Sequence, residues 1–189
     1  MLRATFLGTR EELEGAFLDA LPRFYPGLSD DFVGLLPADE RAKPLDAYWR
    51  RILDKDPAVH GPFARAWHDT ERILSEHVPG RARLDRDAPA SSRSLPATPF
   101  MEAHYFQNDC FMRPGQLLAD AAKLAGIPGI IVQGRYDLLC PPATSHALAT
   151  LWRDSEIRLV EGAGHTLYDP GVRDAVMKAI ADLASRSTA

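Results

Sequence analysis

Apolar residues in the first part of the chain recur every three or four positions, which is the spacing of one face of an α-helix. Three segments show this pattern, residues 10–25, 37–56 and 56–77, and prolines interrupt the sequence between them. Asp39 is the expected N-cap of the second segment. A fourth segment, residues 100–112, is dense in aromatic residues and also predicts a helix. This part of the chain is therefore predicted to be helical.

The pattern changes after residue 113. Two short runs rich in β-branched residues, within residues 127–137 and 156–165, predict buried strands. Helical patterns fill the segments around them, at residues 114–125, 142–153 and 171–185. A helix that connects two strands makes them parallel neighbours in one sheet. We therefore predict a helical domain over residues 1–113 and an α/β domain over residues 114–189.

A polar segment, residues 78–97, interrupts the helical part of the chain. It is rich in Pro, Ser and Arg and has no hydrophobic period, so a surface loop is expected there.

The composition narrows the function classes. Hydrophobic residues make up 46% of the chain and the net charge is −4, which gives no electrostatic basis for binding nucleic acid or an anionic membrane surface. No apolar run is long enough to span a bilayer, and the N-terminus turns acidic before a signal-peptide core develops. The two cysteines are far apart and no residues have metal-ligand spacing. We expect a cytoplasmic protein without metal or cofactor.

Two polar residues follow the two predicted strands. Asp137 comes after the first strand, and His165 follows the second in the sequence GAGHTLYDP. The carboxyl ends of parallel strands share one edge of a sheet, where active sites of this architecture lie. Either residue alone is more often a turn or capping residue. Together they predict a carboxylate that orients an imidazole, with the free ring nitrogen acting as a general base.

The segment GRYDLLCPPATSHALATLWRDSEIRLVEGAGHTLYDP (residues 134–170) resembles the C-terminal part of the proline iminopeptidases, which are α/β hydrolases. Upstream, ARAWHDTE and MEAHYF resemble two further motifs of that family. The resemblance implies a partial α/β-hydrolase fold, in which a helical cap precedes the last β-α-β-α units of the parallel sheet. It also implies that Asp137 and His165 are the acid and the base of a catalytic triad.

The resemblance further implies a substrate, a peptide with a protonated N-terminal proline, and a helical lid that binds it. The amine-binding glutamates of the family match Glu71 and Glu102, while Trp67, Tyr105 and Phe106 would contact the pyrrolidine ring. Carboxylates suit this role because an ammonium group removed from water needs opposite charge. Glu71 has a simpler interpretation as a solvated residue beside Arg72, and Thr70 stands where the family has a second tryptophan.

A family enzyme also needs a serine on a G-x-S-x-G turn and an oxyanion hole from a His-Gly loop. Neither sequence occurs in these 189 residues. We therefore expect the cap and last quarter of a proline iminopeptidase, inactive on its own. A truncated gene product, a misassigned start codon, half of a split enzyme and a deliberate fragment all remain open explanations. The alternative function is an inactive binding or assembly module that retains the amine-binding cap.

The predicted sheet raises a further expectation. Both strands are apolar on both faces, as are strands buried between two layers of helices. With only two strands, at least one edge would expose unpaired peptide groups. We therefore expect self-association, or binding of an N-terminal partner fragment, through that edge.

Overall fold

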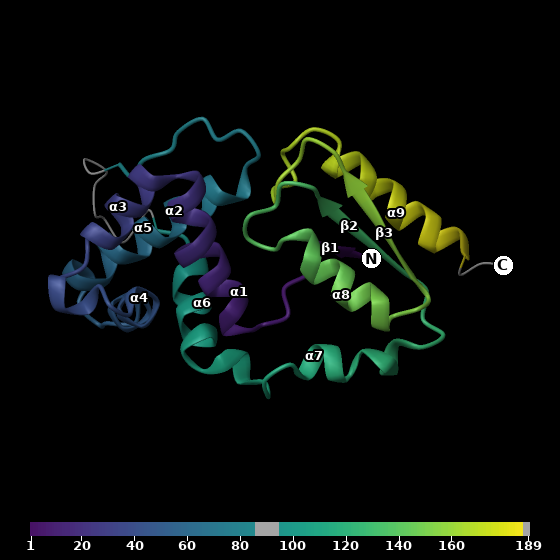
Figure 1. The fold of residues 1–189 in the computed structure, drawn as a ribbon, viewed down its shortest axis with the longest axis horizontal. Coiled ribbons are helices and arrows are strands. Elements are labelled where there is room, and N and C mark those ends of the chain that lie inside the picture. Colours follow the sequence, from purple (N-terminus) through teal and green to yellow (C-terminus); the bar gives the residue numbers. More distant parts are fainter. Residues whose placement is uncertain (86–94, 187–189) are drawn as a thin grey trace. The chain divides into compact units, whose positions relative to one another are not determined.

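The computed structural model describes residues 1–85 and 95–186 (Figure 1). These residues form two compact units: unit 1 comprises Met1–Glu12, Leu74–Val78 and Arg113–Ala189, and unit 2 comprises Leu13–Ile73 and Pro79–Met112. The division differs from the predicted one because two upstream segments join the α/β part. Long-range backbone hydrogen bonds hold both segments there, and the hydrophobic period of a sequence carries no signal for such bonds.

Unit 1 is built on a parallel sheet of three strands in the order β1-β2-β3. The strands are β1 (Leu2–Arg3), β2 (Gly129–Gly134) and β3 (Ser155–Val160). The expectation of two strands was wrong by one, because β1 is only two residues long and too short to show an alternating pattern. Leu2 and Ile157 flank Ile131 on the central strand.

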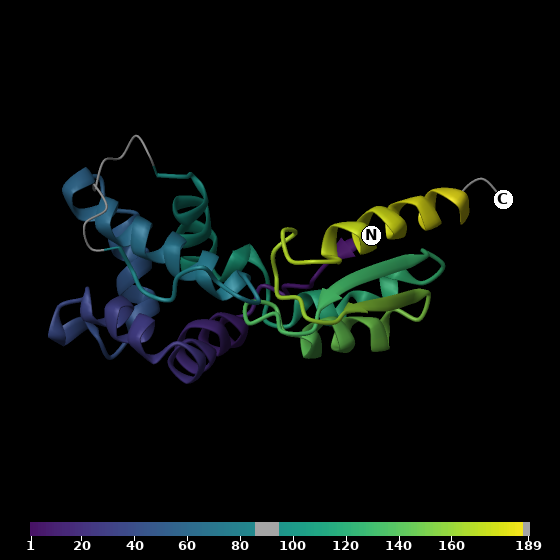
Figure 2. The same cartoon turned by 90° about the horizontal axis from the view of Figure 1, so that it is seen from above.

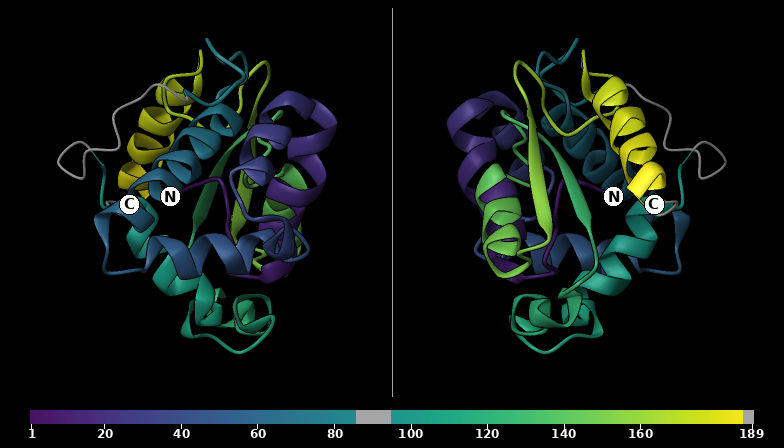
Figure 3. Two further views of the ribbon diagram at one scale, coloured as in Figure 1. Left: turned by 90° about the vertical axis from the view of Figure 1, so that its left-hand side faces the viewer. Right: turned by 90° about the vertical axis from the view of Figure 1, so that its right-hand side faces the viewer.

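Helices cover both faces of this sheet, as Figures 2 and 3 show. On one face Ile131 packs with Leu148 of α8 (Pro142–Leu151) and with Trp152. On the other face Ile130 and Val132 pack against α9 (Val172–Arg186). Strand–helix–strand connection by α8 therefore gives the predicted parallel pair.

The two longer strands differ in burial, and only β2 fits the expectation of two covered faces. Every residue of β2 is buried, whereas β3 is only partly buried and exposes Glu156. Arg158 of β3 forms ion pairs with Glu156 and with Asp182 of α9. Among the described residues no strand pairs with the outer edge of β3. Association through that edge stays a prediction, to be tested by light scattering across a dilution series.

The remaining helices of unit 1 are short. α1 (Arg10–Glu14) begins near the end of the first segment of unit 1, Met1–Glu12, and Glu12 accepts hydrogen bonds from the peptide N–H groups of Leu7 and Thr9. The predicted helix over residues 114–125 is in fact two turns, α7 (Gln116–Ala119) and a 3₁₀ turn at Ala121–Leu124.

Unit 2 is helical. Its helices are η1, a π-helical segment (Gly15–Ala20), α2 (Leu21–Phe24), α3 (Pro26–Gly34), α4 (Pro44–Ile52), most of α5 (Pro57–Ser75) and α6 (Thr98–Gln107). Stacked aromatic rings form its core: Phe17 lies on Trp67 at a centroid distance of 4.3 Å, and Phe32 lies on Tyr48 at 3.9 Å. Such pairs stabilise a core beyond the area they bury.

The prediction that Asp39 is the N-cap of α4 was wrong. Asp39 lies inside a 3₁₀ turn at Ala38–Glu40, and α4 begins four residues later at Pro44. Proline is favoured at the first position of a helix because its φ angle is already helical and its missing N–H is not needed there. Residues 78–85 and 95–97 of the loop predicted at 78–97 form neither helix nor strand, which confirms the prediction for those residues, and residues 86–94 lie outside the described part of the chain.

No helix among residues 1–85 and 95–186 combines the length and the apolar character needed to cross a membrane.

Candidate active site

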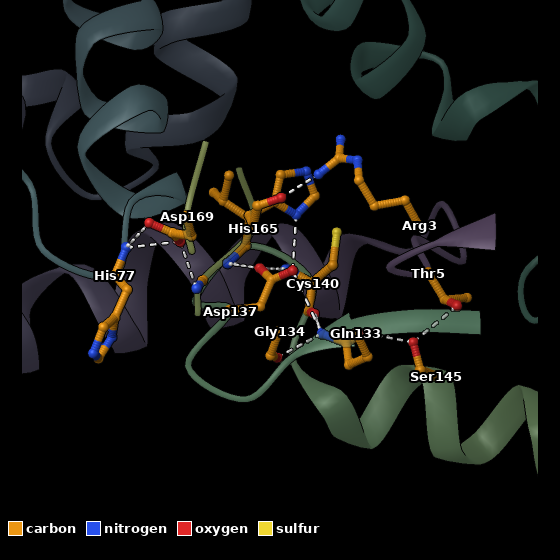
Figure 4. A network of polar contacts seen from close by, with 12 residues as sticks. Arg3, Thr5, His77, Gln133, Gly134, Asp137, Cys140, Ser145, His165 and Asp169 are labelled. Carbon is orange, nitrogen blue, oxygen red and sulfur yellow. Dashed lines mark hydrogen bonds and ion pairs between the residues drawn. The ribbon is translucent and has the colours of Figure 1, made fainter. Parts of the chain in front are cut away.

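Asp137 lies in the turn between β2 and α8, and its side chain is fully buried. One carboxylate oxygen, Oδ1, accepts hydrogen bonds from the peptide N–H groups of Leu139 at 3.0 Å and Cys140 at 2.8 Å. These bonds fix the carboxylate in the turn and leave its second oxygen directed at the next loop (Figure 4). A buried carboxylate with two peptide donors has its charge stabilised without a cationic partner.

The predicted contact between Asp137 and His165 is present. Oδ2 of Asp137 lies 2.8 Å from Nδ1 of His165, and the two residues follow the adjacent strands β2 and β3 (Figure 4). A carboxylate at Nδ1 favours the tautomer with the proton on that nitrogen, so that Nε2 keeps a lone pair. Since the imidazole is 22% exposed, a ligand has access to it. The pair can therefore accept and return a proton.

The loop that carries His165 is held through its backbone. The carbonyl of Ser75 accepts hydrogen bonds from the N–H groups of His165 at 2.8 Å and Thr166 at 3.0 Å. The guanidinium of Arg3 donates to the carbonyl of His165. Sequence reasoning missed Arg3 and Ser75, because neither residue type nor spacing reveals contacts between such distant positions, 162 apart for Arg3 and His165.

A buried polar network extends from Asp137 into the sheet. Gln133 of β2 is completely buried, and its Nε2 donates to the carbonyl groups of Gly134 and Cys140, each at 3.0 Å. Its Oε1 accepts from the hydroxyl of Ser145 at 2.5 Å, and that hydroxyl lies 3.0 Å from the hydroxyl of Thr5. The network joins β2, α8 and the segment that follows β1 (Figure 4). A glutamine inside the apolar run GIIVQG was the available signal for it.

Glu71 and Glu102 form a second candidate site, which lies within unit 2. Glu71 is on α5 and Glu102 is on α6, and a hydrogen bond joins their carboxyl groups. Glu102 also accepts a hydrogen bond from the indole N–H of Trp67 at 2.9 Å. Trp67 precedes Glu71 by one helical turn, so that both reach Glu102 from one face of α5.

Burial changes the protonation of this pair. It raises the pKa of Glu71 to about 8, and the nearby charge of Glu102 and the hydrogen bond between them act in the same direction. Burial also raises the pKa of Glu102, although the hydrogen bonds from Trp67 and Glu71 oppose that change. Two close carboxylates cannot both ionise easily. Glu71 is therefore the member of the pair that keeps its proton at neutral pH.

The aromatic residues predicted to line the Glu71–Glu102 site lie in two different environments. Trp67 is buried, and the ring of Phe106 lies 6.2 Å from it. Tyr105 is 47% exposed, and its ring instead contacts His104 at 5.9 Å and Phe111 at 5.5 Å. Adjacent residues on a helix point in directions about 100° apart, so α6 directs Phe106 and Tyr105 to different surroundings.

This chain is similar in sequence to several proteins named proline iminopeptidase. It is 33% identical over 181 residues to the proline iminopeptidase of Xylella fastidiosa (strain 9a5c), covering 94% of this chain and 56% of that protein. It is 35% identical over 162 residues to the Neisseria meningitidis serogroup B enzyme of the same name, covering 85% of this chain and 50% of that protein. The Arabidopsis thaliana protein of that name is 32% identical over 174 residues, 91% of this chain and 45% of its own length.

This chain thus spans about half the length of the curated relatives it matches. A scan against models of protein families found no match.

Proposed function

We propose, from the similarity of this chain to the proline iminopeptidases, that it contributes to a serine hydrolase that releases N-terminal proline from peptides. Its part in the reaction is the acid–base pair Asp137 and His165, together with the amine-binding carboxylates Glu71 and Glu102. The observation that carries the proposal is the 2.8 Å contact between Asp137 and His165 at the ends of adjacent parallel strands. The parallel sheet between helices supports a portion of the α/β-hydrolase fold as its framework.

In this proposal His165 moves a proton twice. Its Nε2 takes the proton of a serine hydroxyl while the serine oxygen bonds to the carbonyl carbon of proline. It then gives that proton to the amine nitrogen of the departing peptide as the C–N bond breaks. Asp137 keeps the ring oriented and stabilises the imidazolium between these steps. No G-x-S-x-G sequence occurs in the 189 residues, so the proposal takes the serine from polypeptide outside them.

In this proposal Glu71 and Glu102 bind the amine of an N-terminal proline. The secondary ammonium of an N-terminal proline has two N–H groups, and the pair offers two carboxylates to receive them once Glu71 has released its proton. The indole of Trp67 holds Glu102 in place through its hydrogen bond. Trp67 and Phe106 supply an apolar surface of the kind that a pyrrolidine ring contacts.

A second candidate function is a binding module without catalysis. The observation that favours it is that the Glu71–Glu102 pair, with Trp67, is complete inside unit 2. In that case the chain would bind amines and Asp137 and His165 would have no effect on any reaction.

Complementation distinguishes the two candidates. The purified 189-residue chain alone is expected to release no naphthylamine from proline β-naphthylamide. Mixed with the part of the Xylella fastidiosa protein that this chain does not match, it is expected to turn that substrate over. His165→Ala should then abolish turnover, and His146→Ala, which removes an exposed histidine of α8, should preserve it.

Two results would contradict the proposal. One is turnover in the mixture that does not change with His165→Ala. The other is robust turnover by the pure 189-residue chain that a serine-directed inhibitor stops.

A further inference from the structure

One acidic side chain ties the His165 loop to a distant segment of unit 1. We propose that Asp169 is a positioning residue, whose carboxylate sets the backbone from which His165 reaches Asp137. The catalytic consequence rests on the function proposed above, whereas the positioning itself rests only on contacts within unit 1. Asp169 does not touch the imidazole, so that any effect it has on catalysis passes through His165.

The carboxylate of Asp169 bridges two peptide groups from different parts of the chain. Its Oδ2 accepts from the N–H of Gly164 at 2.6 Å and from the N–H of His77 at 3.1 Å, and Oδ1 lies 3.4 Å from the latter (Figure 4). Gly164 immediately precedes His165. Hydrogen bonds of a carboxylate to peptide N–H groups are stronger than neutral ones, so this bridge is well suited to fixing a loop.

The neighbouring peptide groups donate to the same segment. The N–H groups of His165 and Thr166 donate to the carbonyl of Ser75, two residues before His77. Three successive peptide N–H groups of the loop are therefore directed at Ser75 or at Asp169. The ring of His77 also stacks on that of Tyr136, the residue before Asp137, at a centroid distance of 4.7 Å.

The two segments approach too closely for a side chain at position 164. A Cβ atom on Gly164 would lie 2.8 Å from the carbonyl oxygen of Ser75 and 3.0 Å from the nitrogen of His77. It would also lie 3.1 Å from Oδ2 of Asp169. Asp169 is thus the side chain that accepts from both segments where their backbones meet.

Backbone position matters here because packing alone does not hold the imidazole. The ring is partly exposed, and its contact with Asp137 depends on where the loop places the Cα atom of His165. A displacement of about 1 Å at a catalytic group can reduce a rate about 100-fold. Loss of the Asp169 bridge would leave two peptide donors unpaired and release the loop on one side.

The tautomer of His165 provides a test in the 189-residue protein itself. Two-dimensional ¹H–¹⁵N spectra that correlate ring nitrogens with ring protons distinguish the Nδ1–H form from the Nε2–H form. The wild type is expected to populate only the Nδ1–H form at a pH where the ring is neutral. Asp169→Ala is expected to give a mixture of both forms, and at least a tenfold loss of exchange protection at the amides of Gly164 and His77.

Two variants of Asp169 separate the effect of its position from the effect of its charge, and a third variant controls for general destabilisation. Asp169→Asn keeps an oxygen acceptor in place without the charge, and should retain the wild-type tautomer. Asp169→Glu keeps the charge but displaces it by one methylene group, and should retain that tautomer less well than Asn. Asp174→Ala, which removes an exposed carboxylate from the first turn of α9, is the control and should match the wild type.

A single Nδ1–H tautomer with wild-type protection in Asp169→Ala would overturn the inference. If Asp169→Ala does not fold, the other two variants of Asp169 decide. The inference would be overturned if Asp169→Glu retained the Nδ1–H tautomer better than Asp169→Asn. The measurement needs neither a nucleophile nor a substrate. Its failure would leave the proposed peptidase function standing, and a failed complementation assay would leave the role of Asp169 standing.

Discussion

Unit 1 and unit 2 each bury carboxyl groups, but the two units differ in the hydrogen-bond donors that they provide to these groups. In unit 1, Asp137 accepts from two peptide N–H groups and from one imidazole, so that each of its oxygens has a donor fixed by the fold. In unit 2, Glu71 and Glu102 face each other with one indole N–H between them as a donor to Glu102. Asp137 thus has a donor at each oxygen, whereas the described donors to the Glu71–Glu102 pair are the indole of Trp67 and the hydrogen bond between the two carboxyl groups.

The difference teaches what each site requires. A carboxylate with fixed donors is a structural support, and it orients whatever else binds to it. A buried pair that shares a proton has an unfavourable second ionisation, which a bound cation would make favourable. We therefore expect unit 1 to be sensitive to changes in shape and unit 2 to be sensitive to changes in charge.

The largest effect is expected from a change of shape in unit 1. Gly134→Ala would place a Cβ atom 1.9 Å from the carbonyl oxygen of Gly164, a backbone atom of the His165 loop. Overpacking against backbone cannot be relieved by a rotamer change, so we expect a loss of about 3 kcal/mol or more of unfolding free energy. Chemical denaturation would measure it, and the Asp137–His165 contact should be lost as well.

The matched control lies in unit 2. Gly15→Ala adds the same methyl group to a helical position where a Cβ atom would meet nothing within 4 Å. Alanine in place of a helical glycine is expected to stabilise by about 0.5–1 kcal/mol. Similar effects of the two substitutions would contradict the close packing of β2 against the His165 loop.

The next effect concerns charge in unit 2. Because the pKa of Glu71 is raised to about 8 in the folded state, the folded chain keeps a proton that the unfolded chain releases near pH 4.5. Folding stability should therefore fall as the pH rises from about 5 to about 8. A shift of one pKa unit corresponds to about 1.4 kcal/mol, so the fall should reach at least that value.

Glu71→Gln should flatten this pH dependence, since an amide neither ionises nor repels Glu102. Denaturation curves at a series of pH values would show it. Glu40→Gln is the control from the same unit, because hydrogen bonding to Arg51 lowers rather than raises the pKa of Glu40. Glu40→Gln should shift stability without changing its slope between about pH 5 and pH 8. A slope that is equal in wild type and Glu71→Gln would remove Glu71 as its source.

The smallest effect is expected where the chain passes from unit 2 to unit 1. Asp109, Cys110 and Phe111 all have positive φ angles, between 50° and 56°, in the left-handed region that favours glycine. That region costs a non-glycine residue about 1–2 kcal/mol. Replacement by glycine removes this cost, but the greater conformational freedom of glycine in the unfolded state cancels part of the gain. Cys110→Gly is therefore expected to stabilise the chain by about 0.5–1 kcal/mol. A calorimetric melting temperature below that of the wild type would contradict this.

The sequence predicted the features that follow local rules. Hydrophobic period located α4, α5 and α6 of unit 2 but missed α3 (Pro26–Gly34), and the strand–helix–strand order located β2, α8 and β3. The rule that parallel strands end at one edge of a sheet predicted that Asp137 and His165 lie together, and their 2.8 Å contact confirms it. Each of these predictions depends on residues close in sequence or on one general property of a fold.

Other features depend on contacts between distant segments, and the sequence did not reveal them. β1 pairs with a strand more than 120 positions away, and only two of its residues take part. Ser75 and Asp169 act through the peptide groups of the His165 loop, which any residue type would supply. The opposite environments of Tyr105 and Phe106 follow from the rotation of α6, which the aromatic motif alone does not fix.

The most direct test of the central claim is calorimetric titration of the 189-residue chain with L-prolinamide. The experiment is run at about pH 6.5, in two buffers that differ in ionisation enthalpy. We predict binding that releases a proton, because the ammonium group makes ionisation of Glu71 favourable. Glu71→Gln should remove the proton release, Glu102→Gln should weaken binding at least tenfold, and uncharged N-acetylprolinamide should not bind. Binding without proton release, or binding that neither substitution changes, would contradict the account.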